Sequence, residues 1–227
     1  MGKIINLCVL GASYTGKTCV INTFLNSYFD EEYYPTIENK SSKIFLYDKI
    51  LYNLNIYDTA GLNEFNNLQL ISDSIKKCDG FIIVYSLNNR ESIDKIDYYK
   101  DIIKQFKFKD CPTILVANKM DLVDEIVISK TESSDLSSYY KCPMVESSCK
   151  NLNSIVSVFN LILEEINKSY LEIEKQEVQN RKLLLKKTKT EYHLQPSLKK
   201  TKSEFCLQKK KTFVSFFKNT FKDIVSK

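Results

Sequence analysis

The segment Gly11-Ala-Ser-Tyr-Thr-Gly16-Lys17-Thr18 is the feature that most restricts how this chain can fold. It follows a short apolar run, 3–10, that predicts a buried strand, and it leads into residues 16–26, whose spacing predicts a helix. A glycine-rich loop in that context directs backbone N–H groups and a helix N-terminus toward an anion. The segment therefore predicts a phosphate-binding loop, in which Lys17 reaches the β- and γ-phosphates and the Thr18 hydroxyl binds Mg²⁺.

Beyond this loop, short apolar runs alternate with longer amphipathic ones. This alternation predicts an α/β fold with a six-stranded, mostly parallel sheet and helices on both faces. The loops at the carboxyl ends of the strands are then expected to carry the ligand site. The further expected strands cover 43–47, 52–57, 80–85, 113–117 and 143–146, with a turn at Asp48–Lys49, and the further expected helices cover 92–106 and 152–166.

A second motif, Asn118-Lys-Met-Asp121, follows the predicted strand 113–117 and selects the base. A carboxylate such as that of Asp121 accepts hydrogen bonds from the N1–H and the exocyclic amine of guanine, and adenine presents neither donor there. A polar site that the wrong ligand leaves unpaired discriminates by a factor on the order of 10⁴–10⁵. The two motifs together predict a guanine-nucleotide site and argue against an ATPase.

With these motifs, residues 3 to about 169 resemble the Ras-type small GTPases. Asp58-Thr-Ala-Gly61 is similar to the metal and γ-phosphate motif of that family, 33–38 to its first switch, and Glu146-Ser-Ser-Cys-Lys150 to its last guanine loop. The sequence Thr-Ile-Glu at 36–38 favours the Ras branch of the family. The span 121–146 is too short to hold the additional helix that is found in the Rho branch. The resemblance implies the P-loop GTPase fold and a GTP/GDP signalling switch, which requires Mg²⁺.

The resemblance also assigns roles near the γ-phosphate. Thr36 would bind Mg²⁺ beside Thr18, and Asp58 would hold it through water. The Gly61 N–H would contact the γ-phosphate when GTP is bound. The residues that it implies for catalysis are Lys17, Thr36, Gly61 and Leu62, the last at the usual Gln position.

Other implied roles concern the base. Phe29 would pack against the edge of the guanine and Lys119 against its face, while Ser148 would steady Asp121 and the Cys149 N–H would meet the guanine oxygen. The full nucleotide-binding set implied by the resemblance is Ser13, Tyr14, Thr15, Gly16, Lys17, Thr18, Cys19, Phe29, Pro35, Thr36, Gly61, Asn118, Lys119, Asp121, Ser148, Cys149 and Lys150.

Two departures from the family pattern predict slow GTP hydrolysis. Leu62 replaces the Gln that orients the attacking water, and Ser13 replaces a frequent Gly where an activating protein would insert its arginine. Neither Arg90 nor Arg181 lies near the predicted phosphate site in the sequence, so we expect no arginine finger in cis. An alternative is that 63–64, an Asn-Glu pair, positions the water instead. A rival interpretation is a scaffold that holds GTP almost permanently.

The tail differs in charge from the rest of the chain. Residues 1–180 carry 19 Lys and Arg against 25 Asp and Glu, whereas 181–227 carry 14 against 3. We expect a GTPase domain at 1–169, a helical extension and basic linker at 170–208, and a basic Phe-rich amphipathic segment at 209–227. The linker holds a tandem repeat with a period of 13 residues, with copies at 185–195 and 198–208, for which extended motifs are favoured.

The basic segment 209–227 seeks an anionic or apolar partner. Candidates are an anionic membrane surface, a protein groove and the acidic body of the chain itself, and a solvated tail is the remaining alternative. A nucleic-acid role has charge in its favour but no support from the fold. By the resemblance, effectors would bind near 31–42 and 60–77, and an exchange factor is expected. We expect a cytoplasmic protein, peripheral on a membrane if the tail binds lipid.

Overall fold

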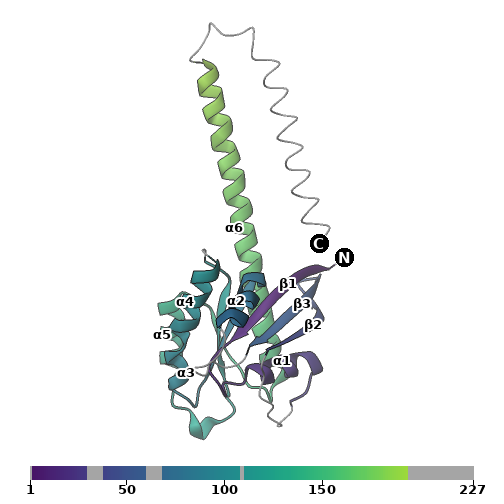
Figure 1. Cartoon of the computed structure of the whole chain (residues 1–227), viewed down its shortest axis with the longest axis vertical. Helices are drawn as coiled ribbons and strands as arrows, with labels where there is room; N and C mark the ends of the chain where they lie inside the picture. Colours follow the sequence, from purple (N-terminus) through teal and green to yellow (C-terminus); the bar gives the residue numbers. More distant parts are fainter. Residues whose placement is uncertain (1, 30–37, 60–67, 108–109, 194–227) are drawn as a thin grey trace. The chain divides into compact units, whose positions relative to one another are not determined.

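The computed structural model describes residues 2–29, 38–59, 68–107 and 110–193, and its centre is a six-stranded sheet (Figure 1). The strand order is β2-β3-β1-β4-β5-β6, and every neighbouring pair is parallel except β2 with β3. The predicted mostly parallel sheet is therefore confirmed. The strands are β1 Lys3–Leu10, β2 Glu38–Tyr47, β3 Ile50–Thr59, β4 Gly80–Ser86, β5 Thr113–Asn118 and β6 Met144–Glu146.

The antiparallel pair β2 and β3 is joined by the turn predicted at Asp48–Lys49. Both turn residues have positive φ, 47° for Asp48 and 63° for Lys49. A two-residue turn of this kind matches the right-handed twist of the strands on either side. The strands are longer than the sequence predicted, because the ladder continues from this turn to the pair Glu38 and Thr59.

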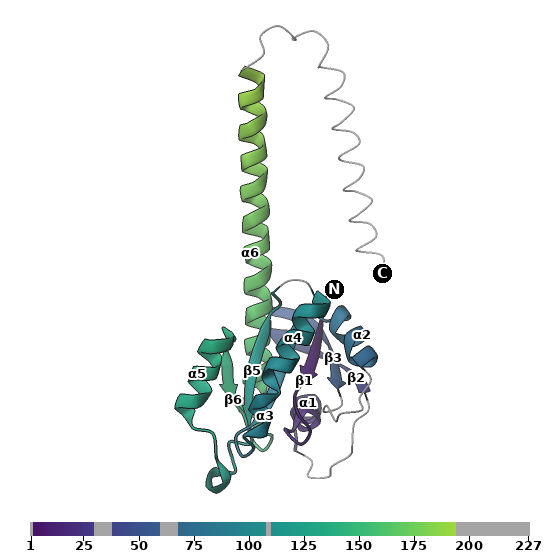
Figure 2. The same cartoon turned by 60° about the vertical axis from the view of Figure 1, so that its left-hand side comes forward.

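Helices cover both faces of the sheet, as predicted (Figures 1 and 2). On one face α1 and α6 pack over β1, β3 and β4, where Phe24 of α1 stacks on Phe159 of α6 with ring centroids 3.5 Å apart. On the other face α2 and α4 pack through buried side chains that include Ile75 and Tyr99. The helices are α1 Lys17–Asn26, α2 Leu68–Lys77, α3 Glu91–Asp94, α4 Ile96–Lys107, α5 Lys130–Tyr140 and α6 Leu152–His193, with a 3₁₀ turn η1 at Val123–Glu125.

The helix predicted over 92–106 is divided in the structure, so that part of the prediction is wrong. The short helix α3 ends at Asp94, and α4 begins at Ile96. Inside α3 the Ser92 hydroxyl accepts a hydrogen bond from the Ser86 N–H at 3.0 Å. This bond ties α3 to the end of β4, whereas α4 packs on the sheet through side chains such as Tyr99.

Helix α6 runs further than the sequence indicated. It continues to His193, so the described part of the first repeat copy, 185–193, is helical rather than extended as predicted. The cause is a composition rich in Leu, Lys and Glu, with no proline between the start of α6 at Leu152 and Pro196. The second copy and the segment 209–227 lie outside the described residues. Within the residues that are described, no helix is long and apolar enough to cross a membrane.

The chain divides into two compact units, Met1–Glu172 and Ile173–Lys227. The first contains the whole sheet and all the loops discussed below. In the second, Arg181 forms an ion pair with Glu177 one helical turn earlier in α6, at 3.6 Å.

Candidate functional site

The loop between β1 and α1 takes a shape that only its glycines permit. Gly11 has φ 148° and Gly16 has φ 92°. A Cβ on Gly11 would lie 2.2 Å from the Val84 carbonyl oxygen, and one on Gly16 would lie 2.4 Å from Nδ2 of Asn118. The loop predicted to bind phosphate is thus packed closely against two neighbouring strand ends.

Lys17 occupies the first turn of α1 and is only 6% exposed. Its Nζ donates a hydrogen bond to the Ala12 carbonyl at 2.8 Å, which holds the ammonium group over the loop. Burial lowers the pKa of Lys17 to about 8, and the nearby Asp58 opposes that effect. An ammonium group partly deprived of water gains strongly from an anion that replaces the water, and this is the property required for binding phosphate.

Thr18 and Asp58 come together from different elements, as the sequence required of a metal site. The Thr18 hydroxyl donates to Oδ2 of Asp58 at 2.7 Å. Asp58, at the end of β3, is 4% exposed, and the pairing of β3 with β1 places it beside Val9. Hydroxyl and carboxylate oxygens are the donors that Mg²⁺ prefers, so these residues fit that ion. The third predicted ligand, Thr36, lies outside the described residues.

Asn118 connects the phosphate loop with the loops expected to read the base. Its Nδ2 donates to the Thr15 carbonyl at 2.9 Å, and its Oδ1 accepts from the Ser147 hydroxyl at 3.0 Å. Ser147 also accepts at its carbonyl from the Met120 N–H at 3.1 Å. Asn118 and Ser147 are both almost completely buried. Three loops that are distant in the sequence are therefore held by one amide and one hydroxyl.

Asp121 is held by Lys150 in this arrangement. Nζ of Lys150 lies 3.7 Å from Oδ2 of Asp121 and 5.9 Å from the centroid of the Phe29 ring. The structure thus brings together three residues that the sequence assigned to the base. Ser148 hydrogen-bonds through its hydroxyl to the Lys150 N–H at 3.1 Å. Its predicted contact with Asp121 stays a prediction.

Two thiols lie at the junction of these loops. Cys149 is 7% exposed, and its Sγ lies 3.8 Å from Oδ1 of Asn118. A hydrogen bond with Cys19, followed by burial, raises the pKa of the Cys149 thiol. A thiol kept protonated in this way is a weak nucleophile, so the side chain of Cys149 is a packing group here.

The rest of the predicted set divides into described and undescribed residues. Thr15 is completely buried, and its hydroxyl donates to the Ala12 carbonyl at 2.9 Å. Tyr14 is 69% exposed and has φ 63°, an uncommon value for a residue with a side chain. Ser13 belongs to the same loop, and Lys119 has φ 66°. Pro35, Thr36, Gly61 and Leu62 lie outside the described residues.

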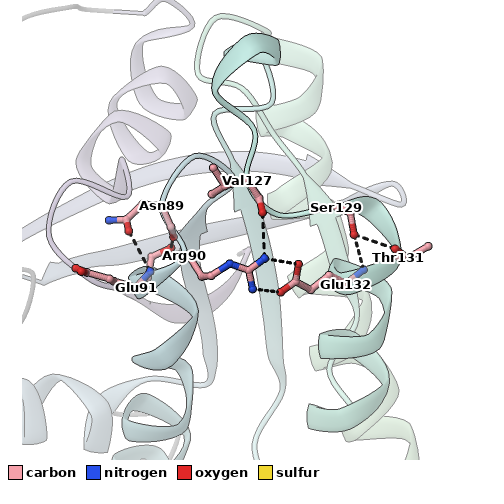
Figure 3. Close-up of polar contacts among 8 residues, drawn as sticks. Asn89, Arg90, Glu91, Val127, Ser129, Thr131 and Glu132 are labelled. Atoms are coloured by element: carbon pink, nitrogen blue, oxygen red, sulfur yellow. Dashed lines mark hydrogen bonds and ion pairs between the residues drawn. The ribbon is translucent and has the colours of Figure 1, made fainter.

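The structure shows contacts of two residues to which the sequence gave no role in the site. Ser147 was within a motif but unassigned, since its link to Asn118 spans 29 residues. Arg90 lies in the loop after β4 and contacts the start of α5 across 42 residues (Figure 3). The sequence offered one usable signal here, Ser129 followed by Glu132, which is a capping-box pattern at the start of α5.

Comparison with known proteins adds the family context. A model of the Ras family matches residues 6–168. The chain is 36% identical over 159 residues to the Ras-like protein rasW of Dictyostelium discoideum, covering 70% of this chain and 73% of that protein. It is 39% identical over 158 residues to rasU of the same organism, with the same coverage, and 35% identical over 163 residues to its GTP-binding protein Rheb homolog, covering 71% and 87%.

Proposed function

Because this chain belongs to the Ras family, whose members are GTP-binding switches, we propose that it is a switch whose GTP-bound state is unusually long-lived. The observation that carries the proposal is Leu62, which stands where the family has a Gln. A leucine side chain has no hydrogen-bonding group, so it cannot orient the attacking water. The residues that the family uses to bind the nucleotide, among them Lys17, Thr18 and Asp121, are present in this chain.

We propose that the nucleotide is bound at two ends of the site, by its phosphates at one end and by its guanine at the other. Lys17 binds the phosphates as a buried cation, and the loop N–H groups around it surround the same oxygens. Asp121 accepts hydrogen bonds from the guanine, and Lys150 holds its carboxylate ready for them. Thr18 and Asp58 would hold Mg²⁺, which supplies positive charge at the β- and γ-phosphates when bound.

Ser13 supports the same proposal from the side of activating proteins. It occupies the position between Ala12 and Tyr14 where the family frequently has a small Gly. A side chain there narrows the space for an arginine supplied in trans. Within the described residues the guanidinium group of Arg90 is bonded to Glu132, so Arg90 does not act as an arginine finger at the phosphate loop. We infer weak stimulation by Ras-type activating proteins.

Single-turnover hydrolysis of GTP by the full chain tests this proposal. We expect hydrolysis slower than that of a Ras protein with the usual Gln, and faster hydrolysis after Leu62→Gln. Wild-type hydrolysis at an ordinary Ras rate, together with no change in Leu62→Gln, would refute it. That result would favour Asn63 or Glu64 as the group that positions water.

A second candidate function is a recruiting scaffold that holds GTP almost permanently and has no meaningful enzymatic cycle. The same two residues, Leu62 and Ser13, favour it. The nucleotide released from freshly purified protein by denaturation separates the two functions. Mostly GDP supports the working switch, and mostly GTP supports the scaffold.

We further propose that effectors contact the chain near 31–42 and 60–77 and that an exchange factor loads it. Of these segments the structure describes only 38–42 and 68–77, which form the start of β2 and the whole of α2. Asn39 stands where Ras proteins usually carry an acidic residue, and it is exposed. This chain is therefore expected to select effectors of its own.

For the segment 209–227 we propose an anionic membrane surface as the partner, which would make the protein peripheral on the cytosolic face of a membrane. Each lysine near such a surface contributes about 1 kcal/mol, and the interleaved Phe side chains add apolar burial. Sedimentation with phosphatidylserine vesicles, using the full chain and a chain that ends at residue 208, tests the idea. Equal binding by both would exclude it.

A further inference from the structure

Arg90 makes three hydrogen bonds that join separate parts of the sequence (Figure 3). Its two terminal nitrogens donate to both carboxylate oxygens of Glu132, at 2.6 and 3.1 Å. One of them also donates to the Val127 carbonyl at 3.1 Å. The planar guanidinium group thus spans the end of one loop and the first turn of α5.

The loop that Arg90 contacts is the one that carries the base-reading residues. It leaves β5 at Asn118 and returns to Leu87, which bonds both of its ends. The Leu87 N–H donates to the Asn118 carbonyl at 3.0 Å, and the Leu87 carbonyl accepts from the N–H groups of Val127 and Ile128 at 2.9 and 3.2 Å. The loop that includes Lys119 and Asp121 is therefore closed at its base by one residue.

Side chains from the loop after β4 also hold the far part of this loop, near Glu125 and Val127. Asn88 donates to Oε2 of Glu125 at 2.8 Å, and Arg90 holds Val127 two residues later. Glu132 is itself fixed, because its N–H donates to the Ser129 hydroxyl at the start of α5. Arg90 accordingly ties the loop to the first turn of α5.

We propose that Arg90 is a positioning residue for guanine recognition, because it fixes the returning end of the loop that presents Asp121. The inference rests on the guanine-nucleotide binding that the family supports. A recognition group must be held within about 0.5 Å of its productive position. The near end of the loop is held at Asn118 and Met120, and the far end is held at Leu87 and by Arg90. Without Arg90 the far end keeps the backbone bonds to Leu87 and the bond between Asn88 and Glu125, so it is held less firmly and Asp121 gains freedom to move from the base.

The expected effect is moderate. The side chain of Arg90 is 62% exposed and that of Glu132 is 33% exposed, and exposed ion pairs are weak. The two-pronged geometry and the additional carbonyl bond place this contact at the upper end of that range. We expect Arg90→Ala to release GDP about fivefold faster, which corresponds to about 1 kcal/mol.

The experiment measures release of fluorescent GDP and of fluorescent inosine diphosphate from the full chain loaded in Mg²⁺. Inosine lacks the exocyclic amine that the second oxygen of Asp121 would bind. We expect Arg90→Ala to speed GDP release more than inosine diphosphate release, so the release rates of the two nucleotides become more similar than in the wild type. A purely structural loss would speed both equally, and that outcome would overturn the proposal.

Arg181→Ala is the matched control, because Arg181 also forms an ion pair with a glutamate but within α6. We expect it to release both nucleotides at the wild-type rate. The charge exchange Arg90→Glu with Glu132→Arg should recover part of the retention that each single change loses. Wild-type release from Arg90→Ala would refute the role of Arg90, whereas a wild-type chain that retains no guanine nucleotide would refute the proposed function.

Discussion

Replacing Asn118 with Ala should weaken nucleotide binding far more than the loss of one polar contact suggests. The side chain is 1% exposed and joins the phosphate loop at Thr15 to the base loop at Ser147. Each hydrogen bond contributes a net of about 0.5–1.5 kcal/mol, and each buried partner left unpaired costs about 1–3 kcal/mol. We therefore expect the binding-competent arrangement of loops to lose about 3 kcal/mol.

A loss of this size reduces the apparent affinity for GDP by about 100-fold, because the affinity scales with the population that can bind. Titration of the nucleotide-free full chain with fluorescent GDP measures it. Ser147→Ala removes one of the two bonds and should cost about tenfold. The double variant should lose less than the sum of the two single losses, since the residues share a bond.

Asn167→Ala is the matched control for this experiment. Asn167 is also an amide that bonds a side chain on the sheet, the Tyr52 hydroxyl at 3.0 Å, but it lies on α6 away from the loops. We expect it to lower the free energy of unfolding and leave GDP affinity unchanged. If Asn118→Ala bound GDP as tightly as Asn167→Ala, the reasoning that this amide organises the site would be wrong.

Two further predictions concern the phosphate end of the site. Since the pKa of Lys17 is lowered to about 8, its positive charge is present below that pH and lost above it, so GDP affinity in EDTA should fall about tenfold from pH 7 to 9. The variant Lys17→Arg should flatten that profile, and an equal slope in both would contradict the prediction. Gly16→Ala should lower the free energy of unfolding by about 1–2 kcal/mol because an alanine is strained at this positive φ. The new Cβ would also displace the Asn118 side chain, which should lower the free energy of unfolding further. Gly80→Ala, whose Cβ would meet side-chain atoms of Ile166 and Ile162 and no backbone or amide group, should cost less in the same urea titration.

The phosphate loop could be predicted because everything it needs lies within eight residues. Gly11, Gly16, Lys17 and Thr18 are all local, and the strand and helix on either side have clear spacing. The turn at Asp48–Lys49 was also local, and the structure confirms that turn. Where a structural requirement can be met by neighbours in the sequence, the sequence shows it.

The contacts that position the site could not be predicted in the same way. The bond from Ser147 to Asn118 and the pair of Arg90 with Glu132 each depend on how distant loops meet in space. Helix α5 was missed because its sequence, rich in Ser and Tyr, lacks an apolar stripe. The extent of α6 was underestimated because a basic composition with helix-forming residues was interpreted as a linker.

The departure at Leu62 changes which residues would determine how long the active state lasts. A GTP-bound switch leaves that state by hydrolysis or by release of the nucleotide, and the faster route sets the lifetime. If hydrolysis is slow, as proposed, release becomes the controlling route. The lifetime of the GTP-bound state would then be set by the contacts that retain the nucleotide, which are those of Asn118, Lys150 and Arg90. On this argument Arg90→Ala should shorten the lifetime of bound GTP in this chain by the same factor as it speeds release, whereas in Leu62→Gln, where hydrolysis competes, the same change should have less effect.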